Sequence, residues 1–242
     1  MRNGIFALAA AVVLSSASSL GAKAEPVHRV IELFTSQGCN SCPPADRLAA
    51  EFAHVPGTVV ISLPVTYWDY LGWKDSLASP AFTARQKAYA QARGDMQIYT
   101  PQVVVDGVAH AVGSEKDAIE AIAEASRAPT VPISETLAGD KLRIEVSAGA
   151  APGKSARLWL VPILSSASVA IGRGENAGAT VTYTNVAREL RDLGEWNGQD
   201  SKVEVPTAQI RDLGADGAAI LLQADNEGLP GQILGAALTK LQ

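Results

Sequence analysis

The chain has 242 residues, of which 47% are hydrophobic and 19% are charged, and its formal net charge is -5. This acidic balance argues against a nucleic-acid partner, because binding to phosphates requires a basic surface. The length exceeds that of a usual single domain and favours two domains.

The first 24 residues have the features of a signal peptide. Arg2 precedes an apolar run over residues 5–14, and Ala22-Lys23-Ala24 fits the small-x-small cleavage rule. Cleavage after Ala24 would leave 218 residues with a net charge of -7, since two basic residues and no acid are removed. We expect a periplasmic or secreted protein with no membrane span after cleavage, because the run is too short to cross a bilayer; an uncleaved anchor is the alternative.

The next segments surround the two cysteines. Val27 to Phe34 is an apolar, partly β-branched run, which predicts a buried strand that ends in a polar loop. After Cys42, Pro43-Pro44 opens a run with helical spacing that stops at Pro56-Gly57. Because proline is favoured at the start of a helix, the cysteines are expected at a helix N-terminus.

Further elements alternate along the chain as far as residue 128. They are a strand over 59–65, an aromatic loop over 67–75, a helix from Pro80 to about Arg93, a strand and return strand joined by Asp106-Gly107, and a closing helix around 118–123. Beyond residue 128, short alternating runs such as Leu142/Ile144/Val146 are separated by Gly, Asp and Asn. The sequence therefore predicts an α/β domain over 25–128, followed by an all-β, sandwich-like domain over 129–242.

Cys39 and Cys42 are the only cysteines, and they form a C-x-x-C pair. A purely structural disulfide is the weaker interpretation, because a pair three positions apart closes almost no loop. The positive end of a helix favours the thiolate, which is the nucleophile in thiol-disulfide exchange. We therefore predict that Cys39 is exposed and attacks, and that Cys42 lies one turn inward and resolves the mixed disulfide.

The strand, C-x-x-C and helix order resembles the thioredoxin fold. The resemblance implies a cis bond between Thr100 and Pro101, packed against the cysteines, with a free backbone edge for an extended substrate; an ordinary trans proline is the alternative. It also implies a proton-relay role for Glu32 in the first strand. Thioredoxins carry that acid six residues before the first cysteine and Glu32 stands seven before, so an exposed edge position or a salt bridge is the alternative.

Two loops are further candidates. Trp68, Asp69 and Trp73 of the aromatic loop, with Thr100, are predicted to bind substrate, because rigid aromatics in loops are common in recognition surfaces. The alternative is that the rings only cover the core. The stretch Arg173–Gly178 is interpreted as a surface turn with an ion pair, and a position at the domain interface is the alternative.

Several motifs together resemble one known family. They are Glu32-Leu33-Phe34-Thr35-Ser36-Gln37-Gly38-Cys39, Ser41-Cys42-Pro43-Pro44-Ala45-Asp46, Tyr67-Trp68-Asp69, Leu71-Gly72-Trp73-Lys74-Asp75, Ser79-Pro80, Tyr99-Thr100-Pro101-Gln102 and Arg173-Gly174-Glu175-Asn176-Ala177-Gly178. On these motifs the chain is identified as a member of the bacterial secreted proteins catalogued as domain of unknown function 1223. That family is assigned to the thioredoxin-like superfamily, and its name records no function.

Three functions follow as hypotheses. The first is a thiol-disulfide oxidoreductase without a cofactor, which acts on a protein or small-molecule thiol or disulfide and exchanges electrons with an unknown redox partner. The second is a Cu(I)-binding or delivery protein that uses the same two thiolates, with His110 or Met96 as a further ligand. The third is a non-catalytic protein whose β-rich half binds a partner. No histidine or cysteine follows residue 110, so no separate catalytic site is expected there.

Overall fold

The computed structural model describes residues 26–150 and 155–241, so the predicted signal peptide, residues 1–24, lies outside the described residues. Up to residue 125 the elements are β1 (Arg29–Thr35), α1 (Pro43–Ala53), β2 (Thr58–Pro64), the 3₁₀ helix η1 (Asp69–Leu71), α2 (Pro80–Arg93), β3 (Gln102–Val105), β4 (Ala109–Val112) and α3 (Lys116–Ala125). This confirms the predicted order of strands and helices in this part.

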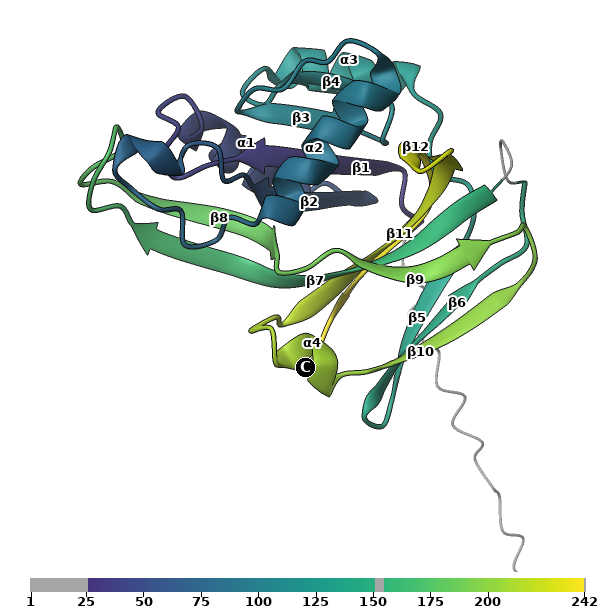
Figure 1. Cartoon of the computed structure of the whole chain (residues 1–242). Helices are drawn as coiled ribbons and strands as arrows, with labels where there is room; N and C mark the ends of the chain where they lie inside the picture. Colours follow the sequence, from purple (N-terminus) through teal and green to yellow (C-terminus); the bar gives the residue numbers. More distant parts are fainter. Residues whose placement is uncertain (1–25, 151–154, 242) are drawn as a thin grey trace, which may run out of the picture.

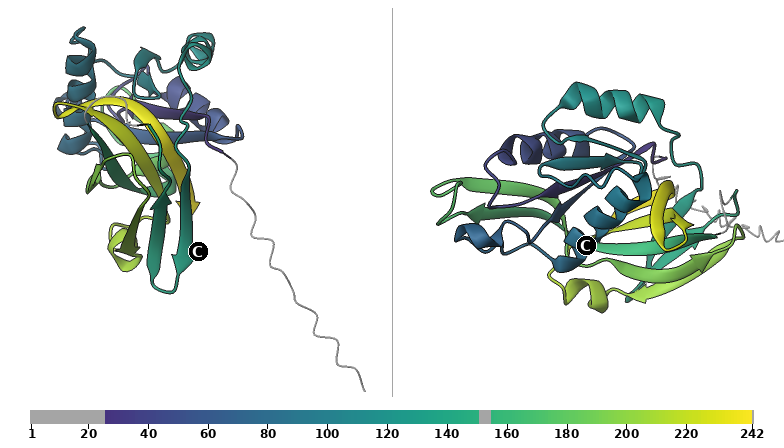
Figure 2. Two further views of the ribbon diagram at one scale, coloured as in Figure 1. Left: turned by 90° about the vertical axis from the view of Figure 1, so that its right-hand side faces the viewer. Right: turned by 45° about the horizontal axis from the view of Figure 1, so that its top comes forward.

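The rest of the chain is almost entirely β. Its elements are β5 (Ile133–Ala138), β6 (Lys141–Val146), β7 (Ser155–Ala170), β8 (Thr180–Ala187), β9 (Arg191–Trp196), β10 (Ser201–Pro206), the short α4 (Ala208–Arg211), β11 (Gly217–Asn226) and β12 (Leu229–Lys240). Figures 1 and 2 show α1, α2 and α3 gathered at one end of the molecule and the sheet of β5, β6 and β10 at the other.

The two parts share one large sheet, whereas the sequence predicted that the β-rich part forms a sandwich-like unit of its own. The strand order is β12-β11-β7-β8-β2-β1-β3-β4, with β9 beside β7. The parts join where β8 runs parallel to β2, at Ser62 opposite Val186, and the side chain of Asn185 donates a hydrogen bond to the backbone oxygen of Val60 at 3.0 Å. The division at residue 128 falls between α3 and β5, and two separate domains there stay a prediction.

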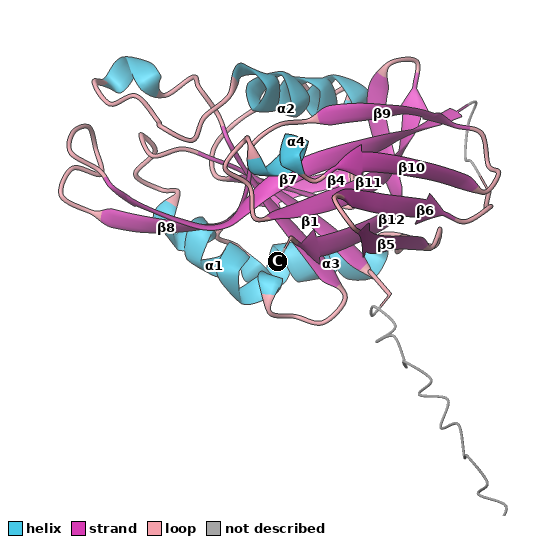
Figure 3. Cartoon of the chain, turned by 90° about the horizontal axis from the view of Figure 1, so that it is seen from below, coloured by secondary structure: helices cyan, strands magenta, loops and turns pink. Residues whose placement is uncertain are grey.

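The helices cover opposite faces of this sheet, with α1 and α3 on one face and α2 on the other (Figure 3). Side chains of β1 alternate between these faces, as a period of two requires. Ile31 and Leu33 pack with α1 and α3, whereas Val30 and Phe34 pack with α2. Glu32 therefore belongs to the face that α2 covers.

A second core lies between the large sheet and the small sheet of β5, β6 and β10, so the sandwich-like packing expected for this part is present locally. Ile144 of β6, Leu160 of β7 and Ile220 of β11 are fully buried there. Among the described residues, no helix has the length and apolar character that a membrane crossing requires.

Candidate functional site

The cysteine pair lies where the sequence places it, at the start of α1. β1 ends at Thr35, a short loop follows, and Cys42 is the N-cap residue of α1, with proline at the first helical positions. Cys39 and Cys42 form a disulfide. Cys39 is only 1% exposed and Cys42 is 0% exposed, so the prediction of an exposed Cys39 is wrong for this state of the protein.

The loop between β7 and β8 is tied to the segment that carries Cys39. The side-chain amide of Asn176 donates hydrogen bonds to the backbone oxygens of Gln37 and Cys39, both at 2.9 Å. Asn176 belongs to the Arg173–Gly178 stretch, for which the sequence favours a surface turn. The structure favours the alternative, because this loop contacts the first part of the chain directly at the cysteines.

We expect Asn176→Ala to make the disulfide react faster with dithiothreitol, by up to about 30-fold. Two hydrogen bonds worth about 1 kcal/mol each hold the loop to the cysteine segment, and their loss raises the population of open forms. Quenching with a maleimide at timed intervals measures the rate of reduction. Glu175→Ala in the same exposed loop is the matched control, since Glu175 makes no hydrogen bond or ion pair within the described part of the chain. Equal rates for both variants would show that Asn176 does not limit access.

The aromatic loop lies against the cysteine loop. The indole N–H of Trp68 donates to the hydroxyl of Thr100 at 2.7 Å. A methyl group added at Gly38 would meet the Cβ of Trp68 at 3.0 Å, so this position next to Cys39 has no room for a side chain. The structure thus brings Trp68 and Thr100 together beside the cysteine pair.

Trp73 and Asp69 support the same region in different ways. The indole N–H of Trp73 donates to the side-chain oxygen of Gln37 at 2.8 Å, and the ring packs on Ile171 and its neighbours. Asp69 accepts a hydrogen bond from the backbone N–H of Asp75 at 3.1 Å, within its own loop. Trp73 therefore covers part of the core and, with Asp69, supports the cysteine loop. Substrate binding by these residues stays a prediction.

Pro101 directly precedes β3, and the Thr100-Pro101 bond is cis, as predicted. A methyl group added at Gly113 would meet Pro101, Leu33 and Ala45 within 3.1 Å, so Pro101 lies close to the first turn of α1. A contact between Pro101 and Cys39 itself stays a prediction.

Glu32 is buried and faces α2, away from the α1 face of the sheet. Its carboxylate accepts hydrogen bonds from Arg85, from Nε at 2.5 Å and from Nη2 at 3.1 Å, and a further one from the hydroxyl of Tyr89. Of the alternatives weighed for this residue, the structure matches the salt bridge. The expected relay to Cys42 lacks the required geometry, because a strand position seven residues before the cysteine points to the other face than one six residues before.

Asp46 is the buried acid that the structure places near Cys42. Its backbone N–H donates to the backbone oxygen of Cys42 at 3.1 Å, and its Oδ1 accepts a hydrogen bond from the hydroxyl of Thr35 at 2.8 Å. Its Oδ2 is enclosed and has no hydrogen-bond partner among the described residues. Burial raises the pKa of Asp46 to about 7, against the opposing effect of the Thr35 hydrogen bond and with the help of the negative Asp75. A carboxyl that titrates near neutral pH can accept and return a proton.

Asp75 and Tyr183 complete this buried polar group. Burial raises the pKa of Asp75, although the backbone N–H groups of Gln37 and Leu77 donate to its carboxylate at 2.8 Å. Burial and the two nearby carboxylates raise the pKa of Tyr183, which comes from β8. Sequence reasoning did not identify Asp46, Asp75 or Tyr183 as residues of the site. Asp46 could have been found, because residues four apart on a helix share a face and Cys42 is four residues earlier.

The two further copper-ligand candidates have other surroundings. The ring of His110 lies 2.7 Å from the hydroxyl of Tyr99 and 3.1 Å from the carboxylate of Asp95. Met96 is exposed, with its backbone in the left-handed region. Within residues 26–150 and 155–241 no cluster of three histidine, cysteine or acidic side chains has the arrangement of a metal site.

Comparison with known proteins adds the family. The family described as "Protein of unknown function (DUF1223)" matches residues 30–223. Protein AGR_C_4864 from Agrobacterium tumefaciens has a crystal structure, and its sequence is 33% identical to this chain. The two structures superpose with a TM-score of 0.81 over 90% of this chain and 96% of that one. HBP35 of Porphyromonas gingivalis is similar in fold only, with 15% identity and a TM-score of 0.59 over 90% of this chain and 76% of that one. The search of curated proteins gives no match.

The family match covers most of the sequence, and it includes the cysteine loop, the aromatic loop and the Arg173–Gly178 loop that meet in the structure. The relative from Agrobacterium tumefaciens extends the likeness over nearly its whole length. The chain therefore belongs to the family of proteins of unknown function DUF1223.

Proposed function

We propose that this protein is an exported thiol-disulfide oxidoreductase whose first part is a thioredoxin-like unit. The observation that carries the proposal is the Cys39–Cys42 disulfide at the N-terminus of α1, one helical turn before the buried Asp46. The order of β1, C-x-x-C, α1, β2, α2, β3, β4 and α3, with Pro101 just before β3, supports the thioredoxin-like assignment. The predicted signal peptide, residues 1–24, supports action in the periplasm or outside the cell.

In the proposed reaction, the reduced protein reduces a substrate disulfide. The thiolate of Cys39 attacks one substrate sulfur, the substrate S–S bond breaks, and a mixed disulfide and a substrate thiolate form. Cys42 gives its proton to the carboxylate of Asp46 and attacks the sulfur of Cys39. This step expels the second substrate thiolate and leaves the protein oxidised by two electrons. The reverse sequence oxidises a substrate dithiol.

The surroundings of the disulfide suggest how a substrate would reach it. Because Cys39 is buried and Asn176 binds the backbone beside it, the β7–β8 loop has to move before a substrate sulfur can approach. We propose that a protein or small-molecule disulfide then rests on Trp68 and Thr100, while Asp69 and Trp73 keep the cysteine loop in place.

Trapping of mixed disulfides tests the proposal and the division of roles. Cys42→Ser is expected to accumulate mixed disulfides through Cys39, because no thiol remains to resolve them. Cys39→Ser is the matched control and is expected to accumulate far fewer. Both variants are isolated from the periplasm after acid quenching and also exposed to glutathione disulfide, and the adducts are measured by mass spectrometry.

Other outcomes would contradict the proposal. Equal trapping by both variants would remove the assignment of Cys39 as the nucleophile. No trapping by either variant, with tight Cu(I) binding by the reduced protein that either substitution weakens, would favour the copper function, since each cysteine then supplies one soft ligand. No trapping and no copper binding would favour a non-catalytic partner-binding protein.

A further inference from the structure

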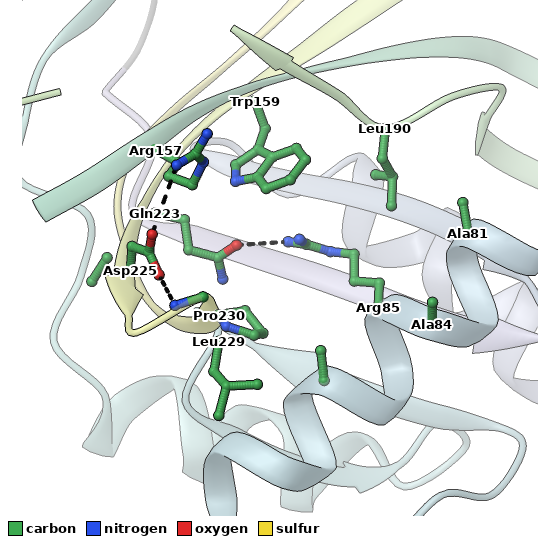
Figure 4. Close-up of a pocket in the computed structure, with 13 residues that line it drawn as sticks. Ala81, Ala84, Arg85, Arg157, Trp159, Leu190, Gln223, Asp225, Leu229 and Pro230 are labelled. Atoms are coloured by element: carbon green, nitrogen blue, oxygen red, sulfur yellow. Dashed lines mark hydrogen bonds and ion pairs between the residues drawn. The ribbon is translucent and has the colours of Figure 1, made fainter. Parts of the chain in front are cut away.

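A cavity of about 350 Å³ lies away from the cysteine pair, between α2 and the strands β7, β11 and β12 (Figure 4). Its volume is in the range of small-molecule sites. Most of the lining is apolar, and it includes Ala81, Ala84, Trp159, Leu190, Leu229 and Pro230. The alanines of α2 leave room for a bound molecule, and the ring of Trp159 offers a flat apolar surface.

Arg85 is one of four polar or charged side chains that line this cavity, together with Arg157, Gln223 and Asp225. Figure 4 shows its side chain reaching from α2 toward Gln223, with Trp159 on one side and Pro230 on the other. Its guanidinium is fixed by Glu32, Tyr89 and Gln223, through Nε and Nη2. Nη1 has no hydrogen-bond partner among the described residues, and it is not fully enclosed by the protein. Its N–H groups are therefore available to a molecule in the cavity.

The charges around the cavity argue against an anion. Arg85 is neutralised by the buried Glu32. Arg157 pairs with Asp192 and lies 3.9 Å from Asp225. Two positive side chains thus face three negative ones, and a ligand with a negative charge would add an uncompensated buried charge. An uncharged hydrogen-bond acceptor satisfies Nη1 without this cost.

We propose that this cavity binds a small uncharged molecule with an apolar, aromatic-sized body and a carbonyl group. The carbonyl oxygen accepts a hydrogen bond from Nη1 of Arg85. The apolar body lies against Trp159, whose ring centroid is 6.0 Å from the Arg85 guanidinium carbon. This site is separate from the cysteine pair, so the proposal holds or fails independently of the proposed function.

Three probes of one shape test the proposal with the oxidised protein. Acetophenone has the carbonyl, ethylbenzene lacks it, and benzoate carries a negative charge. Acetophenone is expected to shift the indole N–H signal of Trp159 in NMR titrations, and to bind about three- to tenfold more tightly than either other probe, since one hydrogen bond is worth about 1 kcal/mol. Ala84→Leu on the exposed side of α2 should block binding, because its side chain fills the cavity. Ala92→Leu on the same helix, outside the cavity, is the matched control.

Each other result overturns the proposal. Equal binding of ethylbenzene would show an apolar cavity without a role for Arg85, and tighter binding of benzoate would show an anion site. Unchanged binding by Ala84→Leu would place the probes elsewhere, and no binding by acetophenone would leave the cavity without this ligand class.

Discussion

Glu32→Ala is expected to lower the free energy of unfolding by about 3–5 kcal/mol, because it leaves the guanidinium of Arg85 buried without its counter-ion. Burial opposes the charge of Arg85, but the Glu32 carboxylate more than compensates and raises the pKa of this side chain above its ordinary value. A guanidinium keeps its proton in proteins even without a counter-ion, so the variant cannot escape the penalty by losing the charge of Arg85. Urea unfolding at pH 7 measures the loss.

Two controls define what this loss means. Glu204→Ala removes an exposed partner of Arg143 and should destabilise the protein far less than Glu32→Ala, because water and salt screen a surface ion pair. Glu32→Leu combined with Arg85→Met replaces both charges by apolar groups and should recover most of the loss. A loss below about 1 kcal/mol for Glu32→Ala would show that water reaches Arg85.

A further variant tests the relay role that the resemblance to thioredoxins implies for Glu32. If Glu32→Gln folds but slows the resolution of mixed disulfides as strongly as a change at Asp46, Glu32 takes part in the relay.

Asp46→Asn is expected to raise the free energy of unfolding at pH 8 by up to about 4 kcal/mol and to change it little at pH 4. The pKa of Asp46 is raised to about 7 in the folded protein from 3.8, because burial penalises the charged carboxylate. Its stabilising contribution is therefore complete below about pH 4, and it is lost as the pH rises through 7. Asparagine resembles the protonated acid and keeps an acceptor for Thr35, so it removes this loss. Urea unfolding across pH 4 to 8 tests the sign.

The same substitution should slow the resolution of mixed disulfides at pH 7 by about 100-fold, since general base catalysis contributes about that much. Glu135→Gln is the matched control, because burial also raises the pKa of Glu135 to about 7. Glu135 lies on β5, outside the cysteine site, so its substitution should change stability with the same sign but leave the resolution rate unaltered. Identical rate profiles for Asp46→Asn and the unaltered protein would exclude Asp46 as the proton acceptor.

Local patterns in the sequence determined the elements and the position of the cysteines. The apolar, partly β-branched run of β1, the prolines after Cys42 and the Asp106-Gly107 turn each act over a few residues, and the strands and helices they predict are present. The helix Pro80–Arg93 begins at a proline, whose fixed φ suits the first helical position, and ends at Gly94, which adopts the left-handed conformation that closes a helix. The motifs spread along the chain were also enough to identify the family.

The tertiary structure alone decided what surrounds these elements. It buries Cys39 beneath a loop that carries Asn176, pairs Glu32 with Arg85, and joins β8 to β2 in one sheet. These contacts link positions 137, 53 and 124 residues apart. Turn chemistry and side-chain periodicity act over a few neighbouring residues and leave such pairings open. Two effects select one pairing of distant residues over another. They are the packing of helices against the faces of the sheet and the free-energy cost of leaving a buried charge or backbone group unpaired, and both arise only when the complete chain folds.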